Sequence, residues 1–254
     1  MTIRERFITR PSLHALLGFL SLALLAGPAL AVTVPITWLD QSPTAFGSPV
    51  PNGAVINVPG VGNVTVTYAI PAHWTHSRAQ NPNFTAGNVV FGPDTYSWTN
   101  YEYFSTIFTP GNLGPEVGTI TYTFAGTLPA GSVFVGPIGL GATTSFGGGT
   151  STTRVLQNGT YLGDFVGDAS FGASQFIGGV GNFTVMNSVT GAGGADPWWN
   201  TNLAVVRVDD AVSSITVIQT QLRGDGIGVN IGFALDQVVS EEATTWGGVK
   251  SLFR

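Results

Sequence analysis

The sequence contains no cysteine, so no disulfide, zinc–thiolate site or thiolate chemistry is available. Charge is also scarce: Asp, Glu, Lys and Arg make up 9% of the residues, and Lys250 is the only lysine. Between Val32 and Ser240, four arginines stand against eleven Asp and Glu residues. This acidic balance argues against nucleic acid or an anionic membrane as a partner. The surface must instead consist mainly of Thr, Ser, Asn, Gln and Gly.

Long apolar runs are missing after residue 31, which predicts no transmembrane segment in the mature chain. The one long apolar stretch, Leu13–Leu25, follows three arginines and precedes the small residues of Ala29-Leu30-Ala31. This order is typical of a signal peptide with its cleavage site. We therefore predict a signal peptide over residues 1–31, a mature chain that begins at Val32, and a secreted protein, extracellular or on the cell surface. An uncleaved membrane anchor is the alternative.

No helical period longer than a couple of turns follows the signal peptide, which argues against α/β architectures. Instead, Val64–Ile70 and Gly118–Phe124 alternate apolar and polar residues at period two, as half-buried strands do. The other predicted strands are Ala54–Val58, Tyr103–Phe108, Ser132–Val135, Thr152–Leu156, Thr160–Phe165, Gly181–Met186, Asn202–Val208, Val212–Gln221 and Gly226–Leu235.

About ten strands predict one all-β domain over residues 32–240, an antiparallel two-sheet sandwich of jelly-roll-like form. Asn158-Gly159 predicts a tight hairpin turn, because both residues tolerate a positive φ. The glycine-rich stretches 136–149 and 172–181 are expected to be loops packed on the sandwich, or strands that allow close backbone approach.

Histidines and carboxylates are the candidates for catalysis. His73 and His76 fall in a loop that begins at Pro71, where they could share a metal, but exposed loop histidines are the simpler interpretation. Glu102 and Glu116 flank a strand and could form the acid pair of a glycoside hydrolase. The Glu-x-Asp-x-x-Glu pattern of retaining sandwich glycosidases is absent. We therefore predict no catalytic residue and a protein that is not an enzyme.

Two aspartates are candidates for a structural calcium ion, the one cofactor considered. Asp164 and Asp168 could supply carboxylate oxygens to a hard cation that ties strands together. No Asp-x-Asp-x-Asp-Gly loop accompanies them, and solvated turn aspartates are the alternative.

Tryptophans are the candidates for ligand binding. Trp198 and Trp199 are adjacent in a loop, where both indoles cannot easily be buried, and Trp74 lies in another loop-rich region. Aromatic faces beside Asn and Asp stack on sugar rings or contact a protein partner. Possible partners are thus a polysaccharide or a surface protein, and self-association is also open. Core packing is the alternative role for these residues.

The end of the chain, residues 241–254, changes character and is expected to be a short sorting or docking peptide. Trp246, Lys250, Phe253 and Arg254 form its amphipathic end. The body, with its last strand followed by Asp236-Gln237-Val238-Val239, resembles the Gly/Thr-rich secreted sandwich domains of the bacterial PEP-CTERM class. The chain departs from that class, because it lacks the Pro-Glu-Pro motif and the membrane helix. The resemblance implies an exported bacterial surface or extracellular protein and transfers no catalytic residue.

Together these observations predict a secreted, non-enzymatic β-sandwich that serves adhesion, matrix or surface assembly. A carbohydrate-binding module is the first alternative and a glycoside hydrolase is the second.

Overall fold

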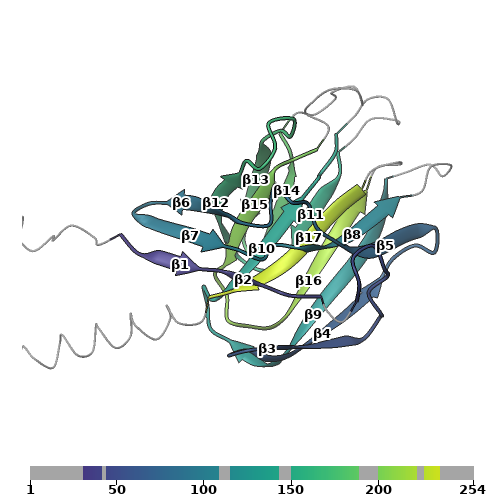
Figure 1. Cartoon of the computed structure of the whole chain (residues 1–254), viewed down its shortest axis with the longest axis horizontal. Helices are drawn as coiled ribbons and strands as arrows, with labels where there is room; N and C mark the ends of the chain where they lie inside the picture. Colours follow the sequence, from purple (N-terminus) through teal and green to yellow (C-terminus); the bar gives the residue numbers. More distant parts are fainter. Residues whose placement is uncertain are drawn as a thin grey trace, which may run out of the picture.

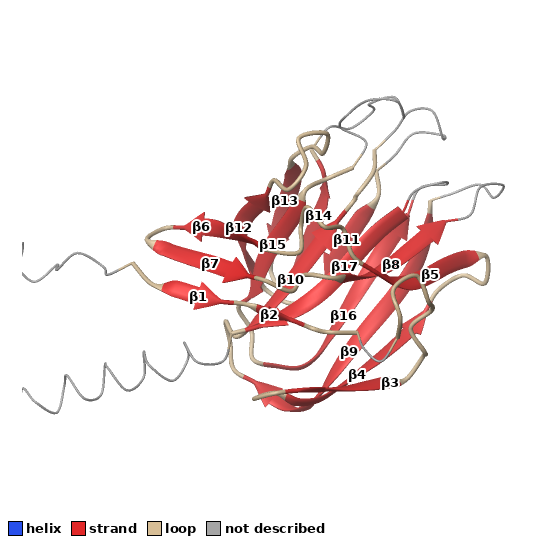
Figure 2. Cartoon of the chain, in the orientation of Figure 1, coloured by secondary structure: helices blue, strands red, loops and turns tan. Residues whose placement is uncertain are grey.

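The computed structural model describes residues 31–41, 44–108, 115–142, 150–188, 200–221 and 226–234. This part of the chain forms strands and loops without a helix (Figure 2). Its seventeen strands make two large antiparallel sheets and one small sheet (Figure 1). The prediction of an all-β antiparallel sandwich is confirmed. The strands outnumber the expected ten because several are short or lie in segments that were expected to be loops.

The first large sheet, sheet I, has the order β12-β15-β10-β17-β8-β5, and β2 pairs with β17 beside this path. Its strands are β2 (Thr37–Trp38), β5 (Trp74–Ala79), β8 (Tyr103–Phe108), β10 (Val133–Ile138), β12 (Gly159–Phe165), β15 (Leu203–Val208) and β17 (Gly226–Phe233).

The second large sheet, sheet II, has the order β13-β14-β11-β16-β9-β4-β3. Its strands are β3 (Ala54–Val58), β4 (Gly62–Ala69), β9 (Glu116–Leu128), β11 (Thr152–Val155), β13 (Ser174–Gly179), β14 (Asn182–Asn187) and β16 (Val212–Gln221). The small sheet joins β1 (Thr33–Pro35), β7 (Asp94–Trp98) and β6 (Gly87–Phe91), with β1 parallel to β7.

The main core lies between the inner faces of sheets I and II. In β9, Ile120, Tyr122 and Phe124 alternate with threonines, so the apolar side chains point inward and the threonines outward. On sheet I, the alternate residues Val229 and Ile231 of β17 also point inward into this core. Period-two patterning therefore accounts for both layers of the sandwich.

A second core covers part of the outer face of sheet I. Phe134 and Leu203 point away from sheet II and are buried beneath Trp38, Tyr96 and neighbouring side chains of the N-terminal strands and the small sheet. Trp38 packs edge-on against Trp98 and Tyr101, with ring centroids 6.1 and 5.1 Å apart. The small sheet thus forms a third layer over one region of sheet I and leaves the β8 region uncovered.

Two local predictions were wrong. The segment around His76 is not a loop but strand β5, which pairs with β8 at the edge of sheet I and buries the side chain of Trp74. Asn158-Gly159 is not a hairpin turn: it connects β11 of sheet II to β12 of sheet I, and Gly159 does not have a positive φ. A Cβ on Gly159 would lie 2.6 Å from the buried ring of Phe183, so close packing between the sheets explains this glycine.

Among the described residues, no helix is both long and apolar enough to cross a membrane.

Candidate functional site

The two candidate histidines contact different partners, both on sheet II. His73 Nε2 lies 2.8 Å from Glu116 Oε2, at the start of β9. His76 Nε2 lies 2.8 Å from the hydroxyl of Tyr68, on β4, and the His76 ring stacks on Phe104 at 5.5 Å and 5°. Each histidine therefore ties the β5 edge of sheet I to sheet II. No group of three His, Cys, Asp or Glu side chains suited to a metal occurs within the described ranges.

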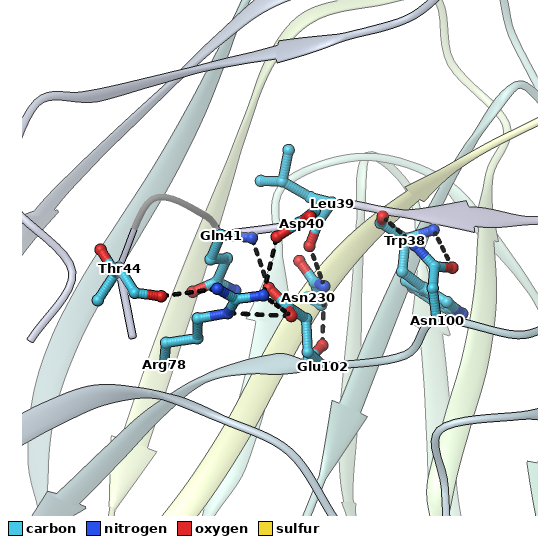
Figure 3. A network of polar contacts seen from close by, with 9 residues as sticks. All are labelled: Trp38, Leu39, Asp40, Gln41, Thr44, Arg78, Asn100, Glu102 and Asn230. Atoms are coloured by element: carbon cyan, nitrogen blue, oxygen red, sulfur yellow. Dashed lines mark hydrogen bonds and ion pairs between the residues drawn. The ribbon is translucent and has the colours of Figure 1, made fainter. Parts of the chain in front are cut away.

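A second set of contacts surrounds Glu102, which is buried at the start of β8 (Figure 3). Arg78 donates from Nε and Nη2 to Glu102 Oε2, at 3.0 and 2.7 Å. Its Nη2 also reaches Asp40 at 2.9 Å, and its Nη1 reaches the carbonyl of Thr44 at 2.6 Å. The backbone N–H of Gln41 donates to the other oxygen of Glu102. We call these five residues the arginine clamp.

Two asparagines extend the arginine clamp along the N-terminal segment (Figure 3). The amide of Asn230 donates to the carbonyls of Leu39 and Glu102, at 2.9 and 2.7 Å. Asn100 bonds to both the N–H and the carbonyl of Trp38. The segment after β2 is thus held across sheet I by charged and amide side chains, which gives this network a structural role.

The two glutamates of the glycoside hydrolase hypothesis contact residues at opposite ends of β5. Glu116 contacts His73, just before the strand, whereas Glu102 contacts Arg78, near its end. Five residues of extended chain separate these partners, roughly 16 Å at 3.3 Å per residue. Glycosidase acid pairs lie about 5–9.5 Å apart. The structure does not bring the two carboxylates together in that arrangement.

The two candidate calcium ligands have separate protein partners. Asp164 accepts a 2.6 Å hydrogen bond from the N–H of Ser174, which links β12 to β13 across the sheets. Asp168 accepts from the N–H and the hydroxyl of Ser170, and from the amide of Asn83. These bonds lower the pKa of Asp168. Asp168 thus orders a local turn, whereas Asp164 lies within β12 and joins strands of the two large sheets.

Of the three candidate ligand-binding tryptophans, one lies among the described residues. Trp74 is 4% exposed and packs against Phe108 in the core, so its ring cannot stack on a sugar, contrary to the prediction. Gly118, on β9, leaves the space that the Trp74 ring fills. Trp198 and Trp199 lie outside the described residues, as do the tail residues Trp246, Lys250, Phe253 and Arg254.

The outer face of sheet II is lined with threonines, and we call it the threonine face. In one row across the sheet, Thr67, Thr121 and Thr216 lie side by side, and the Oγ1 atoms of Thr121 and Thr216 are 3.0 Å apart. None of its residues belongs to either buried core. Its threonines are Thr65, Thr67, Thr119, Thr121, Thr123, Thr152, Thr184, Thr216 and Thr220.

Charge is nearly absent from the threonine face. Among its outward-facing residues in the described strands, Arg154 alone is charged. Neighbouring strands lie about 4.8 Å apart, and alternate residues repeat about every 6.7 Å along each strand. The threonines therefore form a regular array of hydroxyl and methyl groups on this face, beside exposed apolar side chains such as Val55, Val117 and Ile177. The alternating threonines of the two clearest strands could have revealed it from the sequence.

An open cavity of about 230 Å³ lies on the outer face of sheet I, where the third layer does not cover it. Its floor is formed by β8 and β17, and loops supply its walls. Sequence reasoning missed this cavity because its residues come from distant parts of the chain. They are Asn81, Tyr103, Ser105, Ile107, Ile138, Gly139, Phe171, Asn200, Gly226 and Gly228.

Comparison with known proteins gives no family for this chain. No protein-family model matches it, and no curated protein is significantly similar to it.

Proposed function

We propose that this chain is a secreted, non-enzymatic extracellular protein that contributes to adhesion, matrix or surface assembly through the threonine face. The observation that carries the proposal is the size and near neutrality of that face, which spans seven strands and has one charged side chain among its described outward-facing residues. The signal-peptide pattern of residues 1–31 supports the extracellular setting.

The chemistry of threonine suits contact with a broad, neutral surface. Each side chain offers a methyl group for van der Waals contact and a hydroxyl group for hydrogen bonding. Burying a face of this kind avoids the large desolvation penalty of charged groups. A hydrated polysaccharide or another uncharged protein face is the matching partner. The scarcity of lysine favours the same kind of contact, because edge and face lysines normally keep sheet proteins apart.

The non-enzymatic character is supported by the roles of the candidate catalytic groups. His73, His76, Glu102 and Glu116 all take part in contacts that hold the sandwich together. The glycoside hydrolase alternative is weakened by the separation of its two glutamates.

Lysine substitutions on the threonine face test the proposal. Thr67 and Thr123 are exposed on the adjacent strands β4 and β9, so Thr67→Lys/Thr123→Lys places two unpaired cations on the face. The control carries the same charges at the exposed loop residues Val166 and Val180. We expect the control to co-sediment with the washed matrix and envelope of the producing cells as the wild type does.

We expect the face variant to lose at least about tenfold in affinity, because burying unpaired ammonium groups costs more than the 1.4 kcal/mol of that factor. Equal binding by the face variant and the wild type would overturn the proposal.

A further inference from the structure

The open cavity on sheet I has the shape and chemistry of a small-ligand site that is independent of the threonine face. Its glycine floor makes room for aromatic rings: a Cβ on Gly228 would lie 2.3 Å from the ring of Tyr103, so that ring lies flat on the backbone of β17. On β8, Ser105 follows Tyr103 with its side chain on the same face. The floor of the cavity is thus formed partly by the Tyr103 ring and partly by the polar backbone of β17.

Two aromatic walls of the cavity are fixed by packing behind them. Tyr103 stacks on the buried Tyr101 with centroids 6.0 Å apart and planes 29° apart, and the Tyr101 hydroxyl donates to the carbonyl of Gly136. Phe171 stacks on the buried Phe84 at 5.4 Å and 28°. Both rings are therefore held in place before any ligand arrives, which lowers the entropy cost of binding.

The polar groups of the cavity have hydrogen-bonding capacity to spare. The backbone carbonyl of Asn81 accepts from the N–H of Phe84, and the side-chain Oδ1 of Asn81 accepts from the N–H of Asn83. The side-chain NH₂ group of Asn81 is therefore left to donate to a ligand. The carbonyl of Asn200 accepts from Gly172, which fixes its backbone. In the described structure, the Asn200 amide and the Ser105 hydroxyl bond to no other protein group. Burial raises the pKa of Tyr103, so its hydroxyl remains a donor.

We propose that this cavity binds one unit of a neutral sugar, stacked against Phe171 and hydrogen-bonded by Asn81, Ser105 and Asn200. None of the described lining residues is charged, so these residues offer nothing to balance a phosphate or carboxylate. Its 230 Å³ falls below the roughly 300–1,000 Å³ of pockets for drug-sized ligands, which fits a single ring. A pyranose combines an apolar ring face with several hydroxyl groups and matches both kinds of wall.

The test is a titration of the protein, without its predicted signal peptide but otherwise whole, with neutral hexoses and their oligosaccharides. NMR is the readout. For a ligand of this size we expect Kd values in the range of about 1–10 mM, with shifts of the Ser105 and Gly228 amide signals. Ser105→Leu fills the cavity from an outward-facing position and should weaken binding at least about tenfold. Ser214→Leu is the matched control on the outer face of sheet II and should bind as the wild type does. A thermal melt of each variant confirms folding.

Absence of binding to any neutral sugar at about 10 mM would overturn the proposal, and so would equal binding by Ser105→Leu and the wild type. Binding of an anionic sugar alone would also contradict it, because the described residues that line the cavity include no cation. The result is separable from that for the threonine face: Thr67→Lys/Thr123→Lys should still bind the sugar, and Ser105→Leu should still co-sediment with the matrix.

Discussion

Removal of the guanidinium from the arginine clamp should destabilise the fold strongly. In Arg78→Ala, the carboxylate of Glu102, with 5% of its side chain exposed, loses its cation and keeps the Gln41 N–H as a donor. Loss of one partner of a buried ion pair typically costs about 3–5 kcal/mol. We expect about 3 kcal/mol, the lower end of that range, because the Arg78 side chain is itself 14% exposed and water can enter its place.

Urea denaturation followed by tryptophan fluorescence measures this loss. With an m-value of about 2 kcal/mol/M, the midpoint should fall by roughly 1.5 M with an unchanged slope. Asp40→Ala is the control: this carboxylate contacts the same arginine but is 64% exposed, so its removal should cost about 0–1 kcal/mol.

A second substitution tests the reasoning behind that figure. If the penalty comes from an unpaired buried charge, Glu102→Gln in the Arg78→Ala background should recover part of the lost stability, because the neutral amide is cheaper to bury. A loss below about 1 kcal/mol in Arg78→Ala would refute the argument. So would a double variant that is less stable than Arg78→Ala.

Four other outcomes follow from the structure. Hydrogen bonds from the side chain and backbone of Asn158 lower the pKa of Asp210 below its usual 3.8, so their stabilisation is present above that pH and lost as the pH falls below it. Asp210→Asn should flatten the acid limb of a stability–pH curve. Gly159→Ala should cost about 1–3 kcal/mol by urea titration, since its Cβ would overlap Phe183. Addition of EDTA should leave the melting temperature unchanged, because the candidate calcium carboxylates already accept protein hydrogen bonds. Deletion of residues 245–254 should leave circular dichroism unchanged and alter cell fractionation, and unchanged fractionation would contradict a sorting role.

Local patterning was sufficient to predict the strands of the main core. The alternating runs Val64–Ile70 and Gly118–Phe124 fall within β4 (Gly62–Ala69) and β9 (Glu116–Leu128), apart from Ile70. In both runs, burial of one face determines which residues point inward. The same runs place the threonines outward, so the threonine face was readable in principle from the sequence.

Features that depend on distant contacts were not predictable. His73 has no carboxylate near it in the sequence, yet Glu116 reaches it from the start of β9. The sequence places Trp74 in a loop-rich region, but the space above Gly118 buries its ring. The sheet to which a strand belongs is decided by such contacts, and this is why Asn158-Gly159 was mistaken for a hairpin.

The position of β17 has a consequence for how the molecule assembles. It is the last strand along the described chain, yet it lies in the interior of its sheet, bonded to β10 on one side and β8 on the other. Until residues 226–233 arrive, β10 and β8 have no common neighbour, and the amide of Asn230 cannot join the carbonyls of Leu39 and Glu102. Closure across such long sequence separations is slow. A polypeptide threaded through a translocation channel with its N-terminal side first would thus leave sheet I incomplete until residue 233 had emerged.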